Sequence, residues 1–133
     1  MIEMMVTLVI VTLLASVAIP LYQNYTKKAK AAEAWTELEH IATLEDQLFT
    51  DTRQYDTNGT KLPAYGAKFT GKYFVIQITA GTGGPWIASA YLCFGGADAN
   101  CTANFDYRFT IDQSGTKTSL PQGASEPEPG WKL

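Results

Sequence analysis

The chain has 133 residues, a formal net charge of −3 and a sequence pI near 5.0. This length favours a single domain, and an aromatic content of 12% excludes a chain that is disordered by composition. The acidic balance argues against nucleic acid as the main ligand, because phosphate binding needs a dense field of lysine and arginine, although a local basic patch remains open.

The chain opens with a long apolar run, MIEMMVTLVIVTLLASVAIP. Between Met4 and Ile19 no residue is charged, and these sixteen residues span about 24 Å as a helix. A bilayer needs about 20 residues, and the apolar flanks, with Tyr22 and Tyr25 suited to the interface, supply the difference. A secretory signal peptide fits poorly, because a basic segment and a clean small-residue cleavage motif are both missing. The run predicts a membrane-spanning helix.

Helical character resumes after Pro20, which lacks the backbone N–H and should kink or loosen the helix locally. From Tyr25 the sequence is rich in Ala, Glu, Lys and Leu and contains neither Gly nor Pro up to residue 51. Apolar residues at three- and four-residue steps predict a face that packs on a core, formed by Ala34, Leu38, Ile41, Leu44 and Leu48. We therefore predict an apolar helix segment over residues 1–24 and an amphipathic helix over 25–51.

Turn residues then predict a connecting loop over residues 52–71, with signals at Asn58-Gly59, Pro63, Gly66 and Gly71. Alternating stretches after the loop predict three strands, KYFVIQITA, WIASAYLCF and FDYRFTID, and KTSL as a short fourth. One face of these strands should be buried, formed by Phe74, Ile76, Ile78, Phe105, Tyr107, Phe109 and Ile111. The sheet should occupy residues 72–120, with turns at GTGGP and QSGT. The tail 121–133, rich in Pro, Gly and acids, should be loose unless Trp131 packs.

These elements predict an α+β fold: one long N-terminal helix whose second half packs on an antiparallel meander of three to four strands. Residues 25–133 would form the globular domain. Cys93 and Cys101 lack the paired spacing of a zinc site and should form one disulfide in an oxidising compartment. That bond would clamp the connection between the second and third strands and contribute roughly 2.5 kcal/mol in the chain-entropy model.

No arrangement of side chains predicts catalysis or metal binding. His40 lies between Glu39 and Ile41 on the helix, where a surface or packing role is expected rather than a hydrolytic triad. Glu33, Glu37 and His40 share a helix face, as an ordinary solvated face does. We therefore predict no enzyme, no metal and no cofactor. Among the triplets at Asn24, Asn58 and Asn100, the loop residue Asn58 is the most suitable glycosylation site.

The N-terminal segment resembles a known family. Its Ile-Glu followed by two methionines, the apolar run, AIP and YQNY, and then an Ala-rich charged helix, closely resemble the start of type IV pilins over about 35 residues. The resemblance implies a long helix, a connecting loop and a four-stranded sheet. It also implies a prepilin with a basic leader, cleavage by a prepilin peptidase, and methylation of the new N-terminus.

The resemblance also implies a role for Glu3. A lone carboxylate costs several kcal/mol in hydrocarbon, and the N-terminal amine of an axially shifted neighbour would pair with it and set the register. The alternative is a carboxylate that reaches the headgroups and favours the helix dipole. Pro20 is implied in assembly too, because the preceding turns can melt in a filament or simply kink. The side chains expected in the filament core are Met4, Val6, Leu8, Val11, Leu14 and Val17.

The implied function is that of a major subunit of a type IV pilus. It would wait in the inner membrane, polymerise through the apolar helix into an extracellular fimbrium with the pilus assembly machinery, and serve adhesion, twitching motility and DNA uptake. Host surfaces and DNA are the further contacts that such a filament implies. The alternatives are a minor pilin, a type II secretion pseudopilin, or a membrane-tethered monomeric binding domain. Lys27, Lys28 and Lys30 are expected to meet acids of adjacent subunits, such as Glu33 or Glu37, with phosphate of DNA or lipid as the alternative.

Overall fold

The computed structural model describes residues 2–62, 65–66, 68–81, 84–98 and 100–133. It contains one helix, α1 (Ile2–Thr52), followed by a six-stranded sheet. The α+β arrangement predicted from the sequence is confirmed. Pro63 and part of the GTGGP turn lie outside the described residues, as does Met1.

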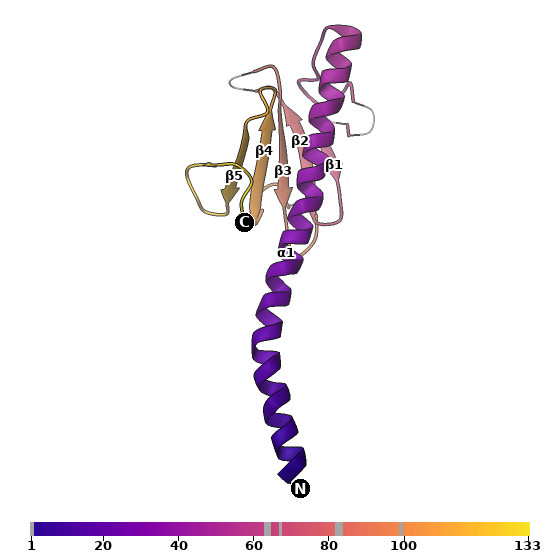
Figure 1. Cartoon of the computed structure of the whole chain (residues 1–133). Helices are drawn as coiled ribbons and strands as arrows, with labels where there is room; N and C mark the ends of the chain where they lie inside the picture. Colours follow the sequence, from indigo (N-terminus) through magenta and orange to yellow (C-terminus); the bar gives the residue numbers. More distant parts are fainter. Residues whose placement is uncertain (1, 63–64, 67, 82–83, 99) are drawn as a thin grey trace.

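Helix α1 runs from Ile2 to Thr52, and it passes through Pro20 without interruption. It ends where Arg53 takes a left-handed conformation with φ 57° and its N–H donates to the carbonyl of Phe49 at 2.8 Å. A left-handed residue after the last turn caps an orphan carbonyl and stops the helix. Figure 1 shows the consequence for shape: the upper half of α1 lies along the sheet, and the lower half projects beyond it.

The sheet is an antiparallel meander with the order β1-β2-β3-β4-β5-β6. Its strands are β1 (Lys68–Thr70), β2 (Phe74–Thr79), β3 (Ile87–Leu92), β4 (Tyr107–Asp112), β5 (Lys117–Pro121) and β6 (Glu128–Pro129). The four strands expected from the alternating pattern are β2 to β5. The edge strands β1 and β6 were not expected: β1 lies inside the predicted connecting loop, and β6 gives order to part of the tail predicted to be loose.

The core lies between α1 and the inner face of the sheet. Helix residues spaced three and four apart are completely buried: Ala31, Ala34, Leu38 and Ile41. They meet alternate residues of the central strands, namely Phe74, Ile76, Ile78, Ala88, Ala90, Leu92, Phe109 and Ile111. Small alanines on both layers let the helix approach the sheet closely, while Phe109 and Trp35 fill the remaining volume edge to face, with centroids 5.5 Å apart.

Two details differ from the expected face pattern. Phe105, predicted on the core side, packs instead with Tyr91 and the cysteines on the opposite side of the sheet, because it precedes β4 and belongs to the loop that folds over that side. Glu45 is completely buried within the apolar stripe of α1, where the sequence pattern had placed only Leu44 and Leu48.

Candidate functional site

The lower half of α1 exposes its apolar side chains. The six residues predicted for a filament core are between 53% and 73% exposed: Met4, Val6, Leu8, Val11, Leu14 and Val17. The helix is long and apolar enough to cross a membrane. An apolar surface of this extent marks a contact with lipid or protein. This half of α1 is therefore expected to be in contact with a membrane or with other protein chains.

The few polar side chains of this segment satisfy themselves within the helix. The hydroxyl of Thr7 donates to the carbonyl of Met4 at 2.9 Å, and that of Ser16 to the carbonyl of Leu13 at 2.7 Å. Hydroxyls bonded back to the helix carry little cost in an apolar setting. Glu3 differs, because its carboxylate lies in the first turn of α1. If lipid or protein covers this turn, the charge is buried, and it then needs a cationic partner from outside the helix.

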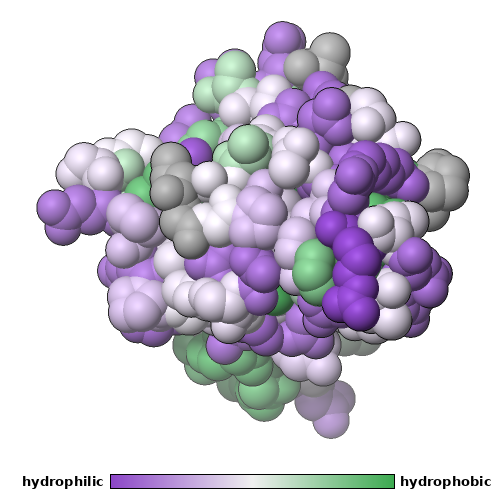
Figure 2. Space-filling model, turned by 90° about the horizontal axis from the view of Figure 1, so that it is seen from above, coloured by the Kyte–Doolittle hydropathy of each residue, from purple (hydrophilic) through white to green (hydrophobic). Residues whose placement is uncertain are grey.

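Figure 2, seen from above, shows a different surface on the globular domain. Hydrophilic and neutral residues cover most of the view; the largest hydrophobic group lies at the lower edge, and smaller hydrophobic patches are scattered between the polar residues. In the part of the chain that the structure describes, the large exposed apolar side chains belong to α1 up to Tyr25, together with Leu133. The part of the domain seen in this view therefore meets water with a mostly polar surface.

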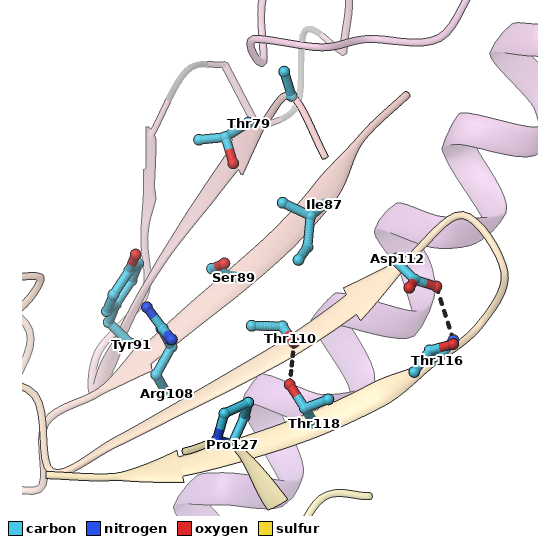
Figure 3. Close-up of a pocket in the computed structure, with 11 residues that line it drawn as sticks. Thr79, Ile87, Ser89, Tyr91, Arg108, Thr110, Asp112, Thr116, Thr118 and Pro127 are labelled. Carbon is cyan, nitrogen blue, oxygen red and sulfur yellow. Dashed lines mark hydrogen bonds between the residues drawn. The ribbon is translucent and has the colours of Figure 1, made fainter. Parts of the chain in front are cut away.

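The sheet face turned away from α1, which we call the outer face, carries a hollow of about 460 Å³. Its floor is a row of short hydroxyl side chains set by the strand register, with Ser89 opposite Thr110 and Thr110 opposite Thr118. The hydroxyls of Thr110 and Thr118 are hydrogen-bonded to each other. Because these side chains are short and larger ones surround them, the sheet face is concave here (Figure 3).

Tyr91 and Arg108 stand opposite each other in the register at one end of the hollow. The Nε atom of Arg108 is buried without a hydrogen-bond partner, and among the described residues no acidic group forms an ion pair with this side chain. A guanidinium that is partly desolvated and lacks a counter-charge is a favourable anion contact, because its N–H groups can bind phosphate or carboxylate in pairs.

The acid at the other end of the hollow is already occupied. The carboxylate of Asp112 accepts hydrogen bonds from the backbone N–H groups of Ser114 and Thr116, both at 2.9 Å. Burial acts to raise the pKa of Asp112, but the hydrogen bonds from Ser114 and Thr116 outweigh it, so the pKa lies below its ordinary value. Asp112 thus stays ionised to hold the β4–β5 turn, and it leaves the charge of Arg108 uncompensated.

A disulfide fixes the loop next to Tyr91. Cys93 and Cys101 are bonded, with Cα atoms 6.0 Å apart, and they pack with Val75, Tyr91 and Phe105 in a second small core. The predicted pairing is therefore present, and it clamps the β3–β4 connection as expected. Through this cluster the disulfide holds the Tyr91 end of the hollow.

The other predicted positions lie outside this hollow. His40 Nδ1 is 2.8 Å from the hydroxyl of Tyr65, which in turn donates to Glu37. Burial and the neighbouring carboxylate raise the pKa of Tyr65, so the phenol stays protonated and ties the α1–β1 loop to the helix. Asn58, exposed in the same loop, accepts a hydrogen bond from the hydroxyl of Thr60; its glycosylation stays a prediction.

Comparisons with known proteins give one family match. The family described as "Type IV minor pilin ComP, DNA uptake sequence receptor" matches residues 20–105, which is more than half of the chain. The match begins at Pro20 and ends before β4, so it spans the amphipathic half of α1 and the disulfide loop. No curated protein and no solved structure matches the chain.

Proposed function

The chain belongs to the type IV minor pilin family, and from this premise we propose that it is a minor subunit of a type IV pilus that takes part in DNA uptake. Membership in this family supports a role as a pilin. The apolar half of α1 fits a subunit that is anchored in a membrane and then associated with a pilus. The finer steps proposed here are storage in the inner membrane, insertion into the filament through that helix, and contact with DNA at the outer sheet face.

The exposed apolar half of α1 is the observation that carries the assembly step. Lipid covers these side chains before extraction, and neighbouring helices cover them in the filament, so the gain on assembly comes from close packing and polar pairing rather than from the hydrophobic effect. The carboxylate of Glu3 then needs a cation, and the amine of an axially shifted neighbour supplies one. Only one axial offset satisfies this pair, which makes Glu3 the residue that sets the register.

Replacing Glu3 with Ala tests this step. We expect the E3A subunit to accumulate normally in the membrane fraction and to be absent from sheared filaments, measured by immunoblot of both fractions. Asp46→Ala removes an exposed acid from the amphipathic half of the same helix and serves as the matched control. Equal incorporation of the E3A and control subunits contradicts the proposal.

The outer face is proposed for DNA because α1 covers the inner one. In a filament whose axis is lined by the apolar helices, the sheet face turned away from α1 points outward. There Arg108 has no acidic partner among the described residues, and the hydroxyls of Ser89 and Thr118 can donate to phosphate oxygens. Lys68 lies in the edge strand on the same face, in register with Gln77. These few cations give a contact that depends strongly on salt.

Arg108→Gln tests the DNA contact. We expect the full chain in detergent to lose affinity for duplex DNA and the slope of log affinity against log salt to shrink by about one unit, as for one phosphate contact. Lys61→Gln makes the same change of charge in the α1–β1 loop and should leave both quantities unchanged. An unaltered salt slope for R108Q places the contact elsewhere.

The principal alternative is a major subunit serving adhesion and twitching motility, since the same apolar helix would serve it equally. A secretion pseudopilin shares the helix as well. The amount of the subunit in sheared filaments separates them: a major subunit accounts for most of the filament mass, a minor subunit for a small fraction, and a pseudopilin for none. A tethered monomeric binding domain is separated by its indifference to the loss of Glu3.

A further inference from the structure

A second hollow lies at the base of the globular domain, where α1 leaves the sheet. It has a volume of about 300 Å³ and is lined by Asn24, Lys27, Lys28, Phe94, Tyr107 and Leu133; we call it the base pocket. Phe94 follows β3 and Tyr107 begins β4, so the pocket opens at the end of the sheet nearest the projecting half of α1 (Figure 1). The pocket therefore opens on the side of the domain from which the apolar half of α1 projects.

Helix geometry sets the depth of this pocket in a bilayer. Twenty residues from Ile2 to Leu21 span about 30 Å, which is the thickness of the hydrocarbon core. Tyr22 and Tyr25 come next and are 70% and 75% exposed, as interfacial tyrosines are. Lys27 and Lys28 lie about 10 Å beyond Leu21 along the axis, and lysine side chains reach back toward the headgroups. Their ammonium groups thus stand at the level of the lipid phosphates.

The helix side of the base pocket carries charge of one sign. Between Glu3 and Glu33 the only charged residues are Lys27, Lys28 and Lys30. Lys30 is committed to the domain, because its ammonium donates to the carbonyl of Phe94 at 3.0 Å and lies 4.0 Å from the centre of the Tyr73 ring.

The acids around the pocket are already engaged. The carboxylate of Asp106 accepts the N–H of Phe94 at 2.7 Å, and Glu128 forms an ion pair with Lys132 at 3.7 Å. Among the described residues, Lys27 and Lys28 form no ion pair within the chain; Lys27 makes only a distant contact, 5.5 Å from the centre of the Phe94 ring. Two cations at phosphate depth are therefore available to a ligand.

We propose that the base pocket binds the headgroup of an anionic phospholipid in the outward-facing leaflet while the unassembled subunit waits in the membrane. Lys27 and Lys28 contact the phosphate, the amide of Asn24 can bind a glycerol hydroxyl, and Phe94 and Tyr107 form the wall on the domain side. This inference rests on the proposed storage of the subunit in a membrane. It implies that a bound lipid holds the globular domain against the bilayer surface. This lipid must then dissociate when the subunit leaves the membrane to enter the filament.

Position favours a lipid over DNA as the occupant. When α1 spans the bilayer, the pocket lies against the headgroup layer, where phosphates are concentrated and a DNA duplex has no room. The outer sheet face, at a distance from the membrane, has no such restriction. Lysines of this kind near a membrane surface each contribute about 1 kcal/mol toward anionic lipid, so two of them predict a preference of about 30-fold.

The test uses the full chain in nanodiscs of phosphatidylcholine alone or mixed with phosphatidylglycerol. Native mass spectrometry counts the phosphatidylglycerol retained by the protein, and a spin label on the lipid headgroup reports proximity to the amides of Phe94 and Tyr107. We expect retention of phosphatidylglycerol over phosphatidylcholine and relaxation centred on these amides. The double variant K27Q/K28Q should lose about 30-fold in retention. The control R53Q/K61Q makes the same change of charge at two exposed positions beyond the far end of α1 and should behave as the wild type.

Equal retention by K27Q/K28Q and the wild type overturns the inference, as does relaxation centred on another part of the domain. Displacement of phosphatidylglycerol by duplex DNA at equal phosphate concentration also overturns it and assigns the pocket to DNA. Hydrogen exchange over residues 2–21 reports separately on insertion. If the amides of residues 2–21 are protected but the protein retains both lipids equally, only the lipid-binding inference is contradicted. If these amides exchange freely, the proposed storage of the subunit in a membrane is contradicted as well.

Discussion

Two buried carboxylates hold the chain where α1 gives way to the first loop. Glu45 and Asp56 are both completely inaccessible to solvent, and the N–H of Asp56 donates to Glu45 Oε2 at 2.9 Å. Asp56 accepts backbone N–H groups from Asn58, Thr60, Lys61 and Leu62. Burial raises the pKa of Glu45 above its ordinary 4.5. For Asp56, burial acts in the same direction, but the four amides outweigh it and lower the pKa.

Glu45→Gln should raise the thermal unfolding midpoint at pH 7. With a raised pKa, the folded state holds its proton more tightly than the unfolded state, so ionisation of Glu45 costs stability as pH rises above its ordinary pKa. The amide keeps an acceptor for the Asp56 N–H and removes the buried charge. The gain should vanish below pH 4.5, where the acid is protonated in both states. A difference between E45Q and wild type that does not vary with pH would count against this account.

Asp56→Asn should have the opposite pH dependence. Its lowered pKa gives the folded state stability that is present above the ordinary value of 3.8 and is lost as pH falls through the lower folded value. The amide cannot accept four N–H groups, and we expect a loss of about 2–4 kcal/mol at pH 7, since hydrogen bonds to a charged group contribute about 1.5–3 kcal/mol each at most. Chemical denaturation at pH 7 and at pH 3 measures both effects.

At the scale of elements, Trp131 anchors the C-terminal tail. Its ring stacks on that of Trp35 with centroids 6.1 Å apart, and its Nε1 donates to the carbonyl of Thr110 at 2.9 Å. Lys117 lies over the same ring, 4.3 Å from its centre. Trp131→Ala should cost about 2–3 kcal/mol, less than a fully buried tryptophan does, and should speed hydrogen exchange in β5 and β6. Unchanged exchange in both strands would show that the tail is held by other contacts.

The disulfide constrains one connection rather than the whole domain. The loop that it closes separates Cys93 from Cys101 by eight residues, for which the chain-entropy model gives about 2.5 kcal/mol. We expect C93S/C101S to fold, to unfold at a lower midpoint by that amount, and to resemble the reduced wild type. Loss of the Tyr91 contacts should change the NMR chemical shifts of residues on the outer face of the sheet. A variant that fails to fold would show that the loop matters for more than this local clamp.

Periodicity predicted the elements that are long enough to display it. The stripe of Ala34, Leu38 and Ile41 and the alternation in β2 and β4 required nothing beyond the sequence. Strand β1 has three residues, too few for an alternating pattern, and two-residue β6 contains Pro129, which an edge strand tolerates because its missing N–H faces no partner. Such short strands form because a neighbouring strand supplies backbone hydrogen-bond partners. The residues of the short segment alone do not indicate that such a neighbour is present.

At the scale of the whole molecule, the large exposed apolar side chains of the described residues gather on the projecting half of α1, with Leu133 as the exception. A chain that begins at Thr26 keeps the helix face that packs on the sheet and loses all the large exposed apolar residues of the helix. We expect it to be monomeric and soluble without detergent, with an unfolding midpoint close to that of the full chain in detergent. Sedimentation and thermal unfolding measure both; self-association of the shortened chain would reveal a contact surface on the globular domain itself.

The functional surfaces were predictable to different degrees. The apolar run and Glu3 stand together in the sequence, so the proposed anchoring segment could be predicted without a structure. The outer hollow was not, because Ser89, Thr110 and Thr118 belong to three strands and meet only through the register. Alternation placed Arg108 on the wet face of β4, but neither its missing acidic partner nor its neighbour Tyr91 follows from the sequence of one strand.

Since α1 is a single element that supplies both the proposed anchor and one layer of the domain, it also fixes the route of mechanical tension. A pull on the outer face of the sheet reaches the anchor by two paths: across the apolar interface, as shear against Leu38 and Ile41, or along the backbone through the segment gripped by Asp56. The cysteine bridge follows β3 in the chain, so for a pull applied at Ser89 or Tyr91 of β3 it lies on neither path. Under such a pull, the mechanical resistance of this subunit therefore resides in side-chain packing and in two buried carboxylates, and not in its covalent cross-link.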